Sequence, residues 1–162
     1  MRQELEQGLM ERFGSLLNLE REKTWTDKYF RCEDGWAIIL FDFFKEIEAT
    51  GEKVRFTCVK EKYGLLRVYP DFDYGHTERF SEVAMLSPKV IGIIHALEQK
   101  SYQTCEFCGQ PGSIRWEYEW LRALCDGCVA TYDSPPRKWP ETVRVNVKPN
   151  PDYKEFTGYT RL

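Results

Sequence analysis

The chain has 162 residues, of which 42% are hydrophobic and 15% aromatic, and it carries a formal net charge of −3 at pH 7. This length and apolar content suffice to bury one ordinary core with a small appended unit, which excludes a disordered chain. No apolar run reaches the roughly 18 to 20 residues of a membrane span, and the opening MRQELEQGLMERFG is charged where a signal peptide is apolar. We therefore expect a globular cytoplasmic protein without a membrane segment.

Two helices are predicted in the first third of the chain. The first covers residues 4–21, where apolar side chains recur at helical spacing although Gly8 and Gly14 interrupt them. The second covers residues 34–51, with Asp34 as its expected N-cap. The apolar stripe of this second helix consists of Trp36, Ile39, Leu40, Phe43, Phe44 and Ile47.

The stretch KVRFTCVKEKYGLLRVYPDFD predicts a β-hairpin. Apolar and polar residues alternate before and after Tyr63 and Gly64, so two strands joined by a turn fit best. The predicted apolar face consists of Val54, Phe56, Cys58, Leu66 and Val68. Cys58 is thereby expected to be a small buried hydrophobe, and the same interpretation is simplest for Cys32.

A further helical region follows the hairpin. Residues 77–86, TERFSEVAML, predict a short helix, and SPKVIGIIHALEQKSYQ predicts a longer one whose Ser87 and Pro88 suit the N-cap and the first turn. Residues 1–104 therefore predict an α+β domain, in which helices pack on a small antiparallel hairpin or sheet.

Four of the six cysteines lie in CEFCGQPGSIRWEYEWLRALCDGC, as two Cys-x-x-Cys pairs separated by sixteen residues. A reducing cytoplasm disfavours disulfides, and a redox Cys-x-x-Cys normally occurs alone at a helix start. The spacing falls within the roughly 15 to 20 residues of four-cysteine zinc sites. We expect one structural Zn²⁺ per chain in a closed cage, with an iron centre or a redox pair as alternatives. The expected ligands are Cys105, Cys108, Cys125 and Cys128.

The spacer between the two pairs predicts a second hairpin, so residues 105–132 predict a C-terminal zinc ribbon. Ile114, Trp116, Tyr118 and Trp120 alternate with polar residues, as in a strand with one apolar face. This stripe either covers the ribbon's own core and docks it on the first domain, or is exposed to a partner. We expect Trp116 to be buried between the ribbon and the first domain, and Tyr63 to be more exposed.

Aromatic and basic residues are the types that anchor protein interfaces most often. Two groups of such residues are candidates for binding a partner, one in the ribbon and one at the turn of the first hairpin. These candidates are Trp116, Tyr118, Trp120 and Arg122 in the ribbon, and Lys60, Lys62 and Tyr63 at the turn.

Three stretches, VKEKYGLLRVY, CEFCGQPG and WLRALCDGC, resemble a group of small phage and bacterial proteins. Those proteins have a Lys-Glu-Lys-Phe-Gly-Gly-Leu-Arg-Phe-like hairpin, a helix and a Cys-x-x-Cys-Gly tail, and the resemblance covers Asp34 to Cys128. Leu65 stands where the group has a second glycine, and Cys128 stands where histidine is common. Exchange of histidine for cysteine keeps a metal ligand. The resemblance implies a phage or prophage setting, hence a bacterial host cytoplasm, and implies no particular activity.

Catalysis is not suggested by the sequence. The two histidines, His76 and His95, have no partner at triad-like or ligand spacing, and the carboxylates Asp71, Asp73 and Glu78 are interpreted as a solvated loop.

Nucleic-acid binding is also disfavoured. Residues 105–132 hold four acidic and two basic side chains, and residues 1–104 hold 18 acidic and 15 basic side chains. Both segments are therefore net negative and should repel phosphate. Residues 133–162 predict a proline-containing extended tail with a slight basic excess.

The class of function that remains is a non-enzymatic protein-interaction module. We expect a phage- or prophage-type regulator or inhibitor that binds a host protein, such as one that defends against phage, by presenting an acidic surface to a basic groove. A nucleic-acid-binding zinc ribbon is the first alternative and an enzyme the second. The sequence predicts neither the partner's identity nor the oligomeric state.

Overall fold

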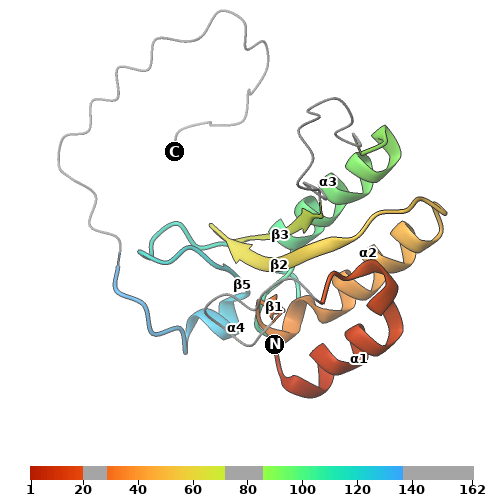
Figure 1. Ribbon diagram of the computed structural model, residues 1–162. Coiled ribbons are helices and arrows are strands. Elements are labelled where there is room, and N and C mark those ends of the chain that lie inside the picture. Colours follow the sequence, from red (N-terminus) through yellow and green to blue (C-terminus); the bar gives the residue numbers. More distant parts are fainter. Residues whose placement is uncertain (20–28, 72–85, 137–162) are drawn as a thin grey trace, which may run out of the picture.

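The structure is a computed structural model of the full chain, and it describes residues 1–19, 29–71 and 86–136. Helices α1, α2 and α3 pack on a three-stranded sheet, and a separate two-stranded sheet follows in the cysteine-containing region (Figure 1). The fold is therefore α+β, as the sequence predicts. None of the helices in these ranges has the length and apolar character needed to cross a membrane.

The first helix is shorter than predicted. Helix α1 spans Gln3–Phe13, and a 3₁₀ turn over Gly14–Leu16 replaces its last part. Leu17 then takes an extended conformation and forms a β-bridge with Phe56. Leu16 and Leu17 are both buried, so burial in the core outweighs continuation of the helix after Gly14.

The second predicted helix is confirmed as a 3₁₀ turn over Asp34–Trp36 that leads into α2, Ala37–Glu48. All six residues of its predicted stripe are buried, and the rings of Phe43 and Phe44 each make an edge-to-face contact with Phe56 of the sheet. The predicted N-cap is wrong, because Asp34 makes no capping bond to the helix. Its carboxylate instead accepts from the Arg2 backbone N–H at 2.6 Å and pairs with the Arg2 guanidinium at 2.5 Å.

The three-stranded sheet has the order β1-β2-β3, with β1 spanning Phe30–Arg31, β2 Phe56–Lys62 and β3 Leu65–Pro70. Strands β2 and β3 form the predicted antiparallel hairpin, and β1, which the sequence does not predict, pairs in parallel with β2.

An irregularity between Phe56 and Cys58 shifts the alternation of β2 by one residue. As a result Val59, not Cys58, faces the helices, together with Leu66 and Val68. The prediction that Cys58 belongs to the apolar face is wrong: it is half-buried on the other face, opposite Tyr69. Cys32 is buried, as predicted.

Helix α3 spans Pro88–Tyr102 and confirms the prediction for this segment. The Ser87 hydroxyl accepts the Val90 N–H at 3.2 Å, which makes Ser87 the N-cap and places Pro88 in the first turn. The Ser101 hydroxyl accepts the Leu66 N–H at 3.0 Å, so α3 is tied to the start of β3. Of the short helix predicted over 77–86, all but the last residue lies outside the described residues.

The last part of the described chain contains β4, Ser113–Ile114, β5, Ala123–Leu124, and the single turn α4, Asp126–Val129. Strands β4 and β5 pair antiparallel, so a hairpin is present, but its strands are much shorter than the predicted alternation over 113–120. Most of the predicted tail, from residue 137 onwards, lies outside the described residues.

Candidate metal centre

The two Cys-x-x-Cys pairs meet in space. The sulfur atoms of Cys105, Cys108, Cys125 and Cys128 all lie within 4.8 Å of one another, and those of Cys108 and Cys125 are 3.6 Å apart. Zinc–sulfur bonds of about 2.3 Å in a tetrahedron place neighbouring sulfurs roughly 3.8 Å apart. The four thiols could therefore hold one metal ion with little rearrangement. They form the only such ligand group within the described ranges.

Two tight turns position the sulfurs. In the first, the Gly109 N–H donates to the Cys105 carbonyl at 2.8 Å, and Gly109 has φ +75°, which side-chain-bearing residues rarely adopt. In the second, Cys125 precedes α4, and the Cys128 N–H donates to the Cys125 carbonyl at 3.1 Å. The Cys128 backbone N–H also lowers the pKa of the Cys125 thiol to about 7, whereas burial raises the pKa of the Cys128 thiol. A bound metal would ionise all four thiols, because it binds the thiolate.

The donor set indicates the kind of centre. Four sulfur ligands from the protein favour zinc, and they leave no open position for water or substrate. Cys105 is fully buried, whereas Cys108 is exposed. The arrangement can therefore stabilise the fold around it, and it offers no site for metal-assisted catalysis.

The first turn of the centre packs directly on the 3₁₀ turn before α2. A Cβ atom added at Gly35 would lie 2.3 Å from the Cys105 carbonyl oxygen and 2.4 Å from the Gly109 nitrogen. The Gly35 N–H donates to the Glu106 carbonyl at 2.8 Å, and the Trp36 indole N–H donates to the Thr104 carbonyl at 2.8 Å. Backbone contact and hydrogen bonds thus join the cysteine turn to the beginning of α2.

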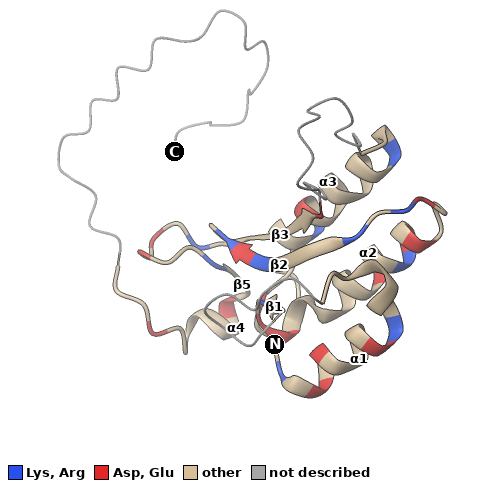
Figure 2. Ribbon diagram, viewed as in Figure 1, with Lys and Arg blue, Asp and Glu red and all other residues tan. Residues whose placement is uncertain are grey.

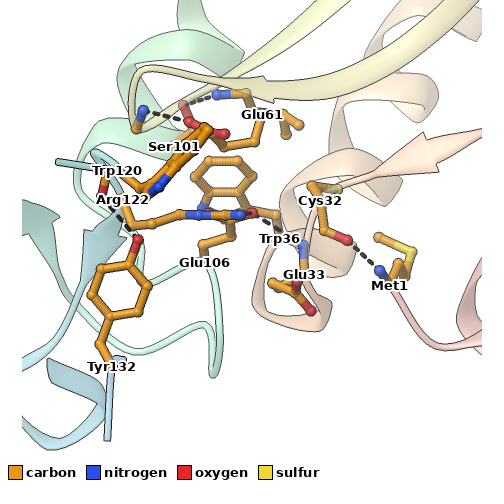
Figure 3. Close-up of polar contacts among 12 residues, drawn as sticks. Met1, Cys32, Glu33, Trp36, Glu61, Ser101, Glu106, Trp120, Arg122 and Tyr132 are labelled. Carbon is orange, nitrogen blue, oxygen red and sulfur yellow. Dashed lines mark hydrogen bonds and ion pairs between the residues drawn. The ribbon is translucent and has the colours of Figure 1, made fainter. Parts of the chain in front are cut away.

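Glu106, between the two cysteines of the first pair, is fully buried. One carboxylate oxygen accepts from the Arg122 guanidinium at 2.5 Å and from the Glu33 N–H at 3.2 Å (Figure 3). The other oxygen has no hydrogen-bond partner among the described residues. Burial raises the pKa of Glu106, although Arg122 acts in the opposite direction. Only the long-range fold reveals this ion pair, since a glutamate inside a Cys-x-x-Cys pair looks exposed in the sequence.

The arginines of the ribbon, residues 105–132, are engaged internally. Arg122 pairs with Glu106, and Arg115 donates to the Asp126 carboxylate at 2.6 Å and to the Leu124 carbonyl at 3.0 Å. Two of the ribbon's four acidic side chains are therefore paired with arginines, which leaves Glu117 and Glu119 and the same excess of two acidic groups that the sequence predicts. Arg122, predicted as a partner-binding residue, is held by an internal ion pair.

Both predicted partner-binding tryptophans are exposed. Trp120 is 71% exposed and Trp116 45% exposed, so the prediction that Trp116 is buried is wrong. The reason is that the alternation ends at Ile114, which is buried, and the chain then turns instead of continuing β4. Tyr118 is half-buried against Tyr132, with ring centroids 5.2 Å apart.

The turn of the first hairpin lies against the ribbon. A Cβ added at Gly64 would lie 2.9 Å from the Ile114 side chain, so β4 meets the turn that carries Tyr63. Tyr63 is 74% exposed, as predicted, and its ring lies 5.7 Å from the Lys62 ammonium. The Lys60 ammonium lies 4.6 Å from the centroid of the Tyr69 ring.

No family model, curated protein or solved structure matches this chain. Its site must therefore be interpreted from its own geometry. Of the histidines and carboxylates considered and set aside in the sequence, His95 is exposed on α3, and Asp73, His76 and Glu78 lie outside the described residues. Asp71 is not solvated as predicted: its carboxylate accepts from the Asn18 amide at 2.5 Å, and only 9% of its side chain is exposed.

Proposed function

We propose that this chain is a non-enzymatic protein-interaction module built around one structural zinc ion. Cys105, Cys108, Cys125 and Cys128 hold the ion, and the exposed tryptophans of the ribbon contact the partner. The observation that carries the proposal is the exposure of Trp116 and Trp120 beside a closed four-sulfur centre.

The loop that carries these tryptophans, residues 115–122, is well fixed. The Tyr132 hydroxyl donates to the Trp120 carbonyl at 2.8 Å, and the Glu119 N–H donates to the Pro135 carbonyl at 3.1 Å. The Arg115 N–H donates to the Arg122 carbonyl at 2.9 Å at the base of the loop. A rigid loop loses little conformational entropy on binding, so two large exposed aromatic rings on it suit an interface.

The surroundings of the tryptophans also suit a protein partner. Glu117 and Glu119 are exposed on the same loop and would form part of a polar rim. Tyr63 is exposed at the hairpin turn that lies against β4, and it extends the aromatic surface beyond the ribbon. In the phage or prophage setting that the sequence resemblance implies, the partner is a host protein, and the chain acts as its regulator or inhibitor in the host cytoplasm.

Capture of a partner from a bacterial lysate, quantified for matched variants, tests the proposal. We expect Trp120→Ala and Trp116→Ala each to weaken capture by about 2 kcal/mol, roughly thirtyfold, with zinc content and melting temperature unchanged. Tyr102→Ala is the matched control, because Tyr102 is 41% exposed but lies at the end of α3. Equal capture by all variants would overturn the tryptophan interface.

A further inference from the structure

Among residues 1–19, 29–71 and 86–136, the helices lie on one face of the three-stranded sheet. Phe30, Val59 and Val68 occupy one cross-strand row and are buried, so the next row along each strand points to the other side. We call this side the open face. It consists of Arg31 from β1, Cys58, Lys60 and Lys62 from β2, and Leu65, Arg67 and Tyr69 from β3.

The open face is basic although the chain as a whole is acidic. Arg31, Lys60 and Arg67 occupy directly adjacent register positions on the three strands. Neighbouring strands lie about 4.8 Å apart, so these three cations lie close together. Lys62 continues the positive charge toward the turn, and Figure 2 shows basic residues along β2.

Acidic groups near the open face compensate only part of its charge. Glu61 points to the opposite side of β2, where its carboxylate accepts the Gly64 N–H at 2.7 Å. Arg67 reaches the edge of the sheet and pairs with Glu98 of α3. On β2 and β3 themselves the open face carries no acidic side chain.

Tyrosine rings accompany the cations. Tyr69 is 37% exposed, and the Lys60 ammonium lies over its ring, so a ring face is turned toward the open side of the sheet. Tyr63 is 74% exposed at the turn, beside Lys62. Cations that contact phosphates, combined with aromatic faces on which bases stack, are the two components of surfaces that bind single strands.

We propose that the open face binds single-stranded nucleic acid, in addition to the protein interaction proposed above and independently of it. Lys60 and Lys62 contact phosphates, and a base stacks on Tyr69 once the Lys60 ammonium has left the ring for a phosphate. A duplex fits less well, because its bases are already stacked on one another and cannot stack on Tyr69. An acidic protein segment would use the cations but would gain nothing from the tyrosine ring faces.

Fluorescence anisotropy with the zinc-loaded full chain and a labelled oligothymidine tests the proposal. We expect salt-sensitive binding that Lys60→Glu and Lys62→Glu each lower about tenfold. Lys45→Glu and Lys89→Glu are the matched controls, since both lysines are exposed on helices that cover the other face. Trp120→Ala should leave oligonucleotide binding unchanged, which separates this site from the proposed protein interface.

The Lys60→Glu variant also separates binding from folding. A glutamate at this position lies between Arg31 and Arg67, so the melting temperature should not fall while the affinity for the oligonucleotide falls. Tyr69→Leu should lower the affinity about tenfold without changing its salt dependence, because it removes stacking but no charge.

Three results would overturn the proposal. The first is equal binding by Lys60→Glu and the Lys45→Glu control, which would place any ligand elsewhere. The second is duplex binding as tight as single-strand binding, which would exclude stacking. The third is competition by polyglutamate as strong as that by oligothymidine, together with no effect of Tyr69→Leu, which would assign the open face to an acidic protein.

Discussion

Gly35 and Cys105 approach one another so closely that no larger residue fits at position 35. A Cβ atom there would lie 2.3 Å from the Cys105 carbonyl oxygen, and the contacting atoms belong to backbone that cannot rotate away. The cysteine turn of the candidate metal centre and the beginning of α2 are therefore in backbone contact. A disturbance of this contact should affect both the fold and the metal centre.

Gly35→Ala should destabilise the protein by about 1 to 3 kcal/mol, because the added methyl group must push the cysteine turn away from α2. We expect a lower melting temperature and faster loss of zinc to a chelator. Gly92→Ala is the control. Gly92 is exposed in α3 with nothing within 4 Å of an added Cβ, so this change should stabilise the helix slightly. Equal melting temperatures for the two variants would contradict the contact.

Arg122→Ala should lower stability by about 2 to 3 kcal/mol, because it leaves the Glu106 carboxylate buried without its cation. Adding Glu106→Gln to this variant should recover part of the loss, since it removes the unpaired charge. Denaturant unfolding of the single and double variants measures the recovery. An Arg122→Ala variant as stable as Lys89→Ala would mean that the ion pair is unimportant.

Cys108→Ser and Cys125→Ser should each abolish zinc binding and lower the melting temperature strongly, because each removes one of the four sulfurs of the cluster. Cys58→Ala should have a small effect, since Cys58 is half-buried on the open face and belongs to no ligand group. Thermal shift assays with and without a chelator compare the three variants. Similar losses in all of them would argue against a metal at the cluster.

Local patterns predict much of this fold. Helix α2 has an uninterrupted apolar stripe from Trp36 to Ile47, and α3 begins at a serine followed by proline, so both helices follow from short-range chemistry. The four cysteines are predicted equally well, because their spacing reflects a fixed ligand geometry.

The remaining features depend on contacts distant in sequence. Strand β1 has two residues and is defined only by its parallel pairing with β2. The irregularity after Phe56 moves Cys58 to the open face, and no sequence pattern marks it. Trp116 looks like part of an apolar stripe because alternation continues in the sequence after β4 has ended.

The electrostatics of the candidate sites also differ from what residue counts predict. The counts treat every charged side chain as exposed. Glu106, however, is buried, and it pairs with Arg122, which lies 16 positions away in the sequence. The counts also hide the open face, because its cations come from three strands and are diluted by acidic residues elsewhere. Net charge therefore hides the buried ion pair of the ribbon and the basic side of the sheet.

Elemental analysis of the protein, purified from cells without added metal, tests the metal centre most directly. We expect one zinc per chain, lost when Cys108 is replaced by serine, because the four sulfurs lie within 4.8 Å of one another and form a closed tetrahedral ligand set. A zinc content near zero, or iron in place of zinc, would contradict the structural zinc centre.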